Sequence, residues 1–170
     1  MSVYSAIDDN DYEQFQKIME NGFNINTKDQ DGQSLLTHVV HNAVVGWDYD
    51  DFIYYLLANG IDVNMTDKHG HTALMHTCMS NLPQIAMDMI KFYHSFDDAE
   101  ECTQFDINMQ NNFGKSSLMF AVKYTRNHKQ QKKLIKTLLK HGAVNDLTDE
   151  TGKTAIDYAE TNSIKKLIRK

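Results

Sequence analysis

The feature that most constrains this chain is an internal repeat. A glycine is followed two residues later by Ser or Thr, and two residues after that by Leu or Ile, and this pattern recurs four times. Repeats at such a period indicate architectures in which small units stack in a row, because one unit cannot bury its apolar surface alone. The pattern therefore predicts a stacked array of units. The four glycines are Gly32, Gly70, Gly114 and Gly152.

Each part of the unit has a local physical role. The glycine permits a tight turn with positive φ, and the Ser or Thr hydroxyl can cap the helix that follows. Apolar residues at i, i+3 and i+4 spacing then predict a second helix, which a glycine closes at Gly22, Gly60 and Gly142. The apolar stripes of the second helices are Phe15/Ile18/Met19, Phe52/Ile53/Leu56/Leu57, Ile85/Met89/Ile90 and Leu134/Ile135/Leu138/Leu139. An Asn precedes each turn glycine by six or seven residues, at Asn26, Asn64, Asn108 and Asn145.

These segments resemble the ankyrin repeat, whose pattern runs Gly-x-Thr-Pro-Leu-His-x-Ala and later Leu-Leu-x-x-Gly-Ala-Asp-Val-Asn. The segments 70–74 (Gly-His-Thr-Ala-Leu) and 56–64 (Leu-Leu-Ala-Asn-Gly-Ile-Asp-Val-Asn) match it, and 152–159 resembles a terminal copy. The resemblance covers nearly the whole chain and implies an all-α solenoid of helix-turn-helix units with extended turn fingers. It divides a single domain, 1–170, into repeats at approximately 1–28, 29–66, 67–110 and 111–148, with a C-terminal cap at 149–170.

The sequence departs from the family pattern in two ways. The family His, which bonds across units, is replaced by Thr37, Met75, Met119 and Asp157, which implies looser turns and a less stable array. The units are also longer than the family's period of about 33 residues. We expect the extra residues of 41–49 and 123–129 to lengthen a helix or a connecting loop, and 94–104 to form an acidic surface loop.

The charges are unevenly distributed along the chain. The net charge is −6, yet residues 1–106 carry 18 acidic and 4 basic residues, whereas 107–170 carry 5 acidic and 13 basic ones. An elongated array would hold these regions apart. The asymmetry serves either solubility alone or the electrostatic steering of a basic partner toward the acidic part.

Composition also bears on where the chain acts. No apolar run reaches the roughly 18 residues of a membrane helix, and the first residues, 1–8, lack the basic start and apolar stretch of a secretory signal. Cys78 and Cys102 are too few for a disulfide framework. We therefore expect a cytoplasmic protein without a membrane partner.

Two segments imitate nucleotide-binding chemistry. The triplets at 114–116 (Gly-Lys-Ser) and 152–154 (Gly-Lys-Thr) end like a P-loop, but the earlier glycine that a P-loop needs is replaced by Met109 and Leu147. The chain also lacks a nucleophile-elbow motif, and Cys102 lies among acidic residues that raise a thiol pKa. We predict no cofactor and no enzymatic activity.

Histidines gather in the central units, where His69, His71 and His76 lie near Cys78, and His38 and His41 belong to the preceding unit. Zinc needs three or four such ligands converging on one point. Stacking could bring His38 and His76 together, since they occupy equivalent positions. We favour the alternative, that the histidines lie on the surface or contact a partner, and assign no metal site.

The family resemblance places partner binding on the fingers and on the exposed side of each first helix. Phe113 and Tyr124 are the preferred hot spots, because aromatic residues dominate interface energetics. Trp47 and Tyr49 form a second aromatic group, which could instead pack on the lengthened helix, so the acidic insertion 94–104 and the loop at Trp47 remain alternative interfaces. The predicted partner-binding residues are Gln30, Asp31, Gln33, His41, Asn42, Lys68, His69, His71, Met79, Asn112, Phe113, Lys115, Lys123, Tyr124 and Lys153.

Three functional hypotheses follow. The first is a protein-binding module, monomeric on its own, that neutralises a basic partner such as a toxin nuclease, in the manner of an inhibitor or immunity protein. The second is an effector or adaptor that recruits a cellular protein. The third is association with nucleic acid through the lysine-rich C-terminal helices, although a solvated lysine face is the commoner cause of that pattern.

Overall fold

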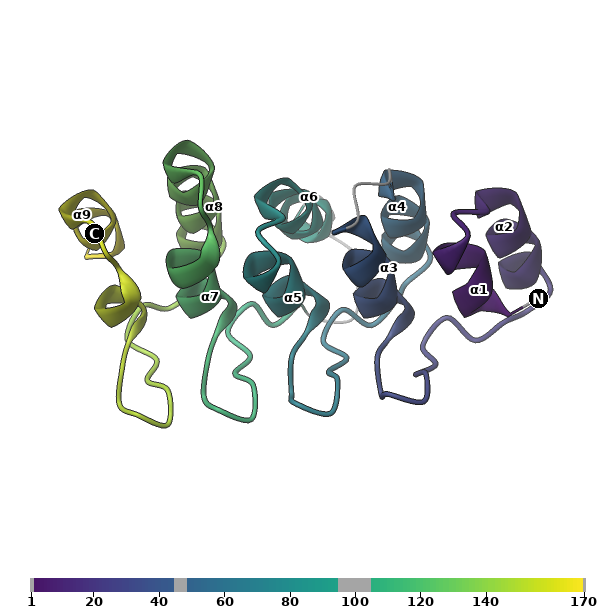
Figure 1. Cartoon of the computed structure of the whole chain (residues 1–170), viewed down its shortest axis with the longest axis horizontal. Helices are drawn as coiled ribbons and strands as arrows, with labels where there is room; N and C mark the ends of the chain where they lie inside the picture. Colours follow the sequence, from purple (N-terminus) through teal and green to yellow (C-terminus); the bar gives the residue numbers. More distant parts are fainter. Residues whose placement is uncertain (1, 45–48, 95–104, 170) are drawn as a thin grey trace.

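The computed structural model describes residues 2–44, 49–94 and 105–169. Regular structure in these ranges is helical and arranged in successive pairs (Figure 1). The helices are α1 (Val3–Asp8), α2 (Tyr12–Glu20), α3 (Leu35–Ala43), α4 (Asp50–Ala58), α5 (Ala73–Met79), α6 (Pro83–His94), α7 (Ser117–Tyr124), α8 (His128–Lys140), the 3₁₀ helix η1 (Ala155–Tyr158) and α9 (Asn162–Ile168).

The helix pairs stack side by side in two layers. The first helices form one layer, in which α1 packs on α3, α3 on α5, α5 on α7 and α7 on η1. The second helices form the other layer, with α4 on α6, α6 on α8 and α8 on α9. Extended loops project from one side of the row, ahead of α3, α5, α7 and η1 (Figure 1). This is the solenoid of helix-turn-helix units that the repeat predicts.

The apolar stripes of the sequence form the core between the two layers. Phe15 of α2, Phe52 of α4 and Leu134 of α8 are fully buried. Burial of this kind is the main source of stability for short helices, which are marginal alone. The expected Ser/Thr caps are also present, since the hydroxyls of Ser34, Thr72 and Ser116 accept hydrogen bonds from the third residue of the following helix.

The extra residues lie between the helices of a pair in the fourth unit. α7 ends at Tyr124 and α8 begins at His128, so residues 125–127 form a connecting loop. In the second unit α3 ends at Ala43 and α4 begins at Asp50, but residues 45–48, including Trp47, lie outside the described part of the chain. The acidic insertion lies outside it as well, apart from His94 at the end of α6. None of the helices described has the length and hydropathy needed to cross a bilayer.

Candidate protein-binding surface

The extended loops, here called fingers, are held by a recurring side-chain device. In the central finger Asp67 Oδ1 accepts hydrogen bonds from the backbone N–H of His69 and His71, at 2.8 and 2.9 Å. In the next finger Asn111 Oδ1 accepts hydrogen bonds from the backbone N–H of Phe113 and Lys115. Asp and Asn favour such turns because their short side chains reach backbone donors two and four residues ahead. The device occurs three residues before each turn glycine, at Asp29, Asp67, Asn111 and Asp149.

This device changes one expectation from the sequence. The turns lack the family His, yet each finger is closed by the bonds of its own Asp or Asn. Two of the replacing residues, Met75 and Met119, are instead buried in the core. Loss of the family bond therefore does not leave these turns without polar support.

Neighbouring fingers are also bonded to one another. Asn112 N donates to His69 O at 3.0 Å, and Asn112 Nδ2 donates to Lys68 O at 3.1 Å. One finger further on, Glu150 N donates to Phe113 O at 3.1 Å. The fingers of the third unit, the fourth unit and the cap thus form a connected row.

The recurring Asn of the sequence links the units at the base of the fingers. Asn64 Oδ1 accepts from the backbone N–H of Asp106, 42 residues further along the chain, at 2.9 Å. Asn108 Oδ1 accepts likewise from Val144 N at 2.9 Å. These bonds fix the spacing between repeats, so the Asn pattern serves stacking and leaves the finger tips free for contacts.

The fingers and the exposed sides of the first helices are together called the finger face. Most of the residues predicted to bind a partner are accessible on it. Nine of the fifteen residues are exposed: Gln30, Asp31, Lys68, His69, Asn112, Phe113, Lys123, Tyr124 and Lys153. Five are half-buried: Gln33, His41, Asn42, Met79 and Lys115.

His71 is the exception, and the expectation of an exposed finger residue is wrong for it. Its side chain is buried, with 8 % of the residue exposed, and its ring is bonded on both sides. Met79 packs partly against the core. Tyr49, expected beside Trp47 in an aromatic group, is buried and donates its hydroxyl to Ile7 O at 3.3 Å, so packing explains it.

The finger face carries two exposed aromatic side chains in its C-terminal half. Phe113 lies at a finger tip with half of its surface exposed. Its backbone is nonetheless fixed, because its N–H and its carbonyl both take part in the finger bonds described above. Tyr124, at the end of α7, is 38 % exposed and stacks on Phe120 with 6.0 Å between ring centroids. A segment whose backbone is already fixed loses less conformational entropy when a partner covers it.

A histidine network lies beneath the fingers of the central units. Asp67 Oδ2 is 3.3 Å from His71 Nδ1 and 3.0 Å from His76 Nε2. His76 Nδ1 is 3.0 Å from His41 Nε2, and His71 Nε2 is 2.9 Å from Asn111 Nδ2. The network thus connects three consecutive units. Stacking pairs His76 with His41, and not with His38, whose Nε2 bonds Asp8 instead.

The bonds of the network define its protons. Asn111 Oδ1 already accepts two backbone N–H groups, so its amide nitrogen faces His71 and donates to Nε2. The proton of neutral His71 is therefore on Nδ1, from which it is donated to Asp67. His76 donates from Nε2 to the same carboxylate and accepts from His41 at Nδ1. Each of the four contacts of the network therefore pairs a donor with an acceptor, and no metal ion is needed to satisfy them.

A metal ion would compete with this arrangement. Asp67, His71 and His76 offer ligand atoms within 4.8 Å of one another, and two histidines with one carboxylate form a common metal-ligand set. Coordination through His71 Nδ1 would move its proton to Nε2, where it would oppose the amide of Asn111. The hydrogen-bonding pattern therefore favours a hydrogen-bond network over metal coordination at these residues.

The ionisation of the network follows from burial and hydrogen bonding. Burial, assisted by neighbouring His41, lowers the pKa of His76 to about 4. Burial alone would raise the pKa of Asp67, but hydrogen bonds from the backbone of His71 and His69 and from the His76 side chain lower it to about 2. At neutral pH His76 is therefore uncharged beside the Asp67 carboxylate. Burial also raises the pKa of the Cys78 thiol to about 12, so it has no thiolate character.

Replacement of Asn111 by alanine is expected to lower the free energy of unfolding by about 2 kcal/mol, because it leaves His71 Nε2 and two finger N–H groups without their partner. Chemical denaturation measures the change. Asp31→Ala serves as the control, since Asp31 is exposed and its carboxylate lies 3.6 Å from the ammonium group of Lys68, which is also exposed. Equal midpoints for both variants would contradict a structural role for Asn111.

Two residues on or beside the finger face were not among those selected from the sequence. Tyr158 of η1 lies within 6 Å of three lysine ammonium groups, and Arg126 follows α7 beside Tyr124. A repeat signal could have found Tyr158, because it stands six residues after its turn glycine, as His38, His76 and Phe120 do. Arg126 belongs to the segment 123–129, which the sequence predicted only to lengthen a helix or a connecting loop.

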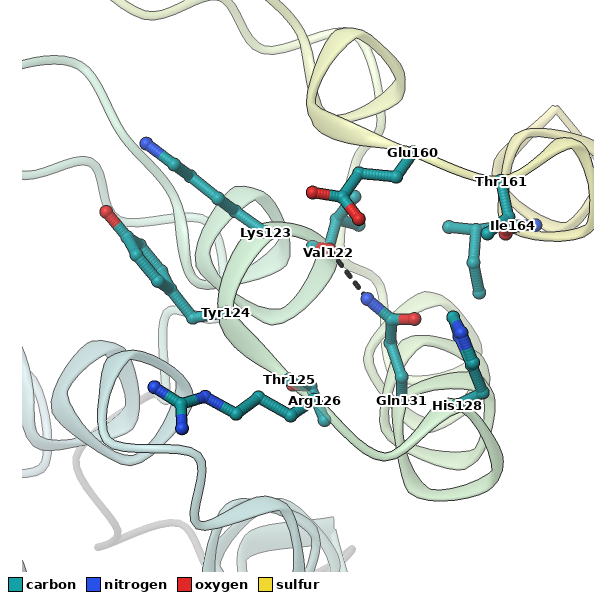
Figure 2. A pocket seen from close by; sticks show the side chains of 10 residues that line it. All are labelled: Val122, Lys123, Tyr124, Thr125, Arg126, His128, Gln131, Glu160, Thr161 and Ile164. Atoms are coloured by element: carbon teal, nitrogen blue, oxygen red, sulfur yellow. Dashed lines mark hydrogen bonds between the residues drawn. The ribbon is translucent and has the colours of Figure 1, made fainter.

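The surface around Arg126 is recessed on two sides. One hollow of about 280 Å³ is lined by Thr125, Gln131 and Ile164, among others, where α7 and α8 meet the cap (Figure 2). Another of about 340 Å³ is lined by Met79, Ser80 and Asn81. Tyr124 and Arg126 line both hollows, so they stand on the ridge between them.

A row of stacked helix pairs that presents a continuous face of loops defines a repeat protein built to bind other macromolecules. The family profile described as ankyrin repeats (3 copies) matches residues 3–92 and, overlapping with them, 40–124. The chain belongs to the ankyrin repeat family, whose members generally act as non-enzymatic scaffolds for protein–protein interaction. No curated protein matches the chain.

Proposed function

We propose that this chain acts by binding one protein partner on the finger face, with Phe113 and Tyr124 at the centre of the interface. The observation that carries the proposal is the exposure of Phe113 on a finger whose backbone is fixed on both sides. Buried aromatic anchors dominate the energetics of interfaces. The output of such a protein is the occupancy of its partner, as in an inhibitor or immunity protein.

The acidic N-terminal units support a partner with a basic region. Asp9, Glu20, Asp51 and Asp88 are all exposed on the first three units. Charges of one sign on one region of a protein attract an oppositely charged partner and raise the rate of association. A basic enzyme such as a nuclease would have this complementarity. Charge reversal at Glu20 and Asp88 is expected to slow association, and an unchanged association rate would contradict the steering role.

Alanine at Phe113 or Tyr124 is expected to weaken partner binding by about 10- to 100-fold, because each change removes an exposed aromatic anchor. The partner is first captured from a lysate of the native cells and identified by mass spectrometry, and its affinity is then measured by calorimetry. Tyr54→Ala is the matched control, since Tyr54 is a 66 % exposed aromatic residue on α4, in the second-helix layer. Binding that tolerates both finger-face variants would overturn the proposal.

Salt distinguishes the two protein-binding hypotheses. A basic partner that high salt releases would support the neutralising inhibitor, because surface attraction is screened at high ionic strength. A partner that resists salt would favour an adaptor that depends on the aromatic anchors. Either result is consistent with binding on the finger face, which the alanine variants test separately.

Nucleic-acid binding is a second candidate, favoured by one observation. Lys132 and Lys136 of α8 line a hollow together with Lys166 of α9. Lysines collected on one surface attract phosphates with a strong dependence on salt. A mobility-shift assay with labelled RNA and DNA at low salt tests this candidate, and the absence of a shift would remove it.

A further inference from the structure

The C-terminal part of the finger face contains a cluster of lysines around one aromatic ring. The ammonium groups of Lys115, Lys123 and Lys153 lie 5.6, 5.4 and 5.8 Å from the centroid of Tyr158. Lys123 is also 5.0 Å from the ring centroid of Tyr124. The three lysines come from two fingers and α7, so stacking of the units brings them together. These three lysines and Tyr158 are called the lysine–Tyr158 cluster.

The ring at the centre of the cluster is held in place. The Tyr158 hydroxyl donates to Asp149 Oδ2, and this bond raises the pKa of Tyr158 to about 12. Asp149 is the residue that closes the finger of the cap, through its bonds to the N–H of Thr151 and Lys153. The cluster is therefore anchored to the finger framework. The attraction of each cation to the ring partly offsets the repulsion among the lysines.

The lysines of the cluster are not neutralised by ion pairs. Within the ranges that the structure describes, the ion pairs of lysines involve Lys17, Lys68 and Lys91 only. The nearby carboxylates have other partners, since Asp149 closes its finger and Asp157 accepts from the backbone and hydroxyl of Thr154. Lys153 interacts electrostatically with Asp157, but none of the three lysines forms an ion pair within the described residues, so the cluster keeps a positive charge that attracts anionic groups.

The ridge and hollows beside the cluster extend this site. Lys123, Tyr124 and Arg126 extend to the same side of the chain in the close view (Figure 2). Arg126 adds a fourth cation, and among the described residues that line the two hollows on its flanks Glu160 is the only acidic one. Thr125 Oγ1, in the wall of the first hollow, is buried and has no hydrogen-bond partner among the described residues. The wall thus offers a hydroxyl to whatever enters.

We propose that the lysine–Tyr158 cluster and the ridge of Tyr124 and Arg126 bind an acidic segment of a partner protein, one that carries several Asp or Glu carboxylates. The proposal rests on the proposed function and specifies its partner. Carboxylates satisfy the cations, while Phe113 and Tyr124 offer apolar surface to the neighbouring residues of a peptide. This mixture of cations and exposed rings fits a protein segment better than a simple phosphate. A partner with separate basic and acidic regions would complement both halves of the chain.

The test is a titration of the full chain with a hexaglutamate peptide at low salt, followed by NMR of the backbone amides. Shifts are expected at Lys115, Lys123, Thr125 and Lys153. The double variant Lys123→Glu, Lys153→Glu is expected to weaken binding by about tenfold or more, because both lysines are exposed and opposing charge replaces attraction. The matched control, Lys133→Glu with Lys140→Glu on α8, makes the same change in net charge on exposed lysines of the second-helix layer that line neither the cluster nor the hollow of Lys132 and Lys136.

Three results would overturn the proposal. One is the absence of shifts with hexaglutamate, and another is an equal loss of affinity in the matched control, which would show that only net charge matters. The third is tighter binding of a single-stranded oligonucleotide of equal charge that is lost in the same cluster variant, which would assign the site to nucleic acid.

The proposed function fails on a different measurement. If the captured partner depends on Phe113 and Tyr124 but hexaglutamate does not bind, the acidic-segment inference is wrong and protein binding on the finger face stands. If hexaglutamate binds at the cluster but the captured partner ignores both aromatic residues, the central role of the aromatic anchors is wrong instead.

Discussion

Replacement of Gly114 by alanine is expected to lower the free energy of unfolding by about 3 kcal/mol. Gly114 has φ +72°, a conformation that costs an L-residue about 1 kcal/mol. An added Cβ would also lie 2.9 Å from Asp149 Cα and 3.0 Å from Glu150 N in the next finger. Both are backbone atoms and cannot rotate away, so the fingers would have to separate, at a cost typical of overpacking, about 2 kcal/mol.

Gly152→Ala is the matched control for this prediction. Gly152 has nearly the same φ, +75°, but nothing lies within 4 Å of its added Cβ. It should lose only the conformational part, about 1 kcal/mol. Urea denaturation followed by circular dichroism compares the two variants. Equal losses would show that the close approach of neighbouring fingers contributes nothing to stability.

Lowering the pH from 7 to 4 is expected to remove about 3 kcal/mol of the free energy of unfolding through His76. The folded-state pKa of His76 is about 4, below the value of 6.5 for a free histidine side chain. As the pH falls through 6.5 the unfolded chain takes up a proton that the folded chain resists, so stability is present above pH 6.5 and is lost progressively toward pH 4. The lowered pKa of His41, caused by burial and by His38, adds to the same slope.

Asp67 acts in a separate, lower window. Its folded-state pKa is about 2, against 3.8 for a free aspartate side chain. Its contribution is therefore present above about pH 4 and is lost as the pH falls from there toward 2. Denaturation midpoints measured at intervals between pH 7 and pH 4 isolate the histidine effect.

The variant His76→Gln provides the check on this assignment. Glutamine can still donate to Asp67 and accept from His41, but it does not titrate, so most of the slope between pH 6.5 and 4 should disappear. His69→Gln, at an exposed histidine of the finger that precedes α5, should retain the slope. A wild-type slope in His76→Gln would show that another group controls acid stability.

The sequence was sufficient to predict the fold because each unit contains the same local signals for turns and helices. Turn glycines such as Gly70, caps such as Thr72 and apolar stripes such as that of α4 each specify a short element with a physical reason, and four copies in register make the reading unambiguous. The same regularity placed Phe113 on a finger tip and Lys123 at the exposed end of a helix. The limits of the repeats, at approximately 28, 66, 110 and 148, are kept as a proposed division.

The misplaced residues all depend on contacts between units. His71 looks exposed from its place after a turn glycine, but Asp67 on one side and Asn111 of the next unit on the other enclose its ring. Tyr49 looks like a loop residue until α1 supplies the carbonyl of Ile7 for its hydroxyl. The local sequence around His71 and Tyr49 does not indicate these hydrogen-bond partners, because Asn111 lies 40 residues from His71 and Ile7 lies 42 residues from Tyr49.

The sequence by itself determined the helices, their caps, the turns and the class of protein, since these follow from neighbours along the chain. Only the tertiary structure decided which groups meet across units. These are the hydrogen-bond network around Asp67, the close approach of neighbouring fingers at Gly114 and the lysines around Tyr158. Stacking places residues about one repeat apart within bonding distance. The chemistry of the finger face therefore depends on the register between units, which a repeat pattern implies but does not resolve atom by atom.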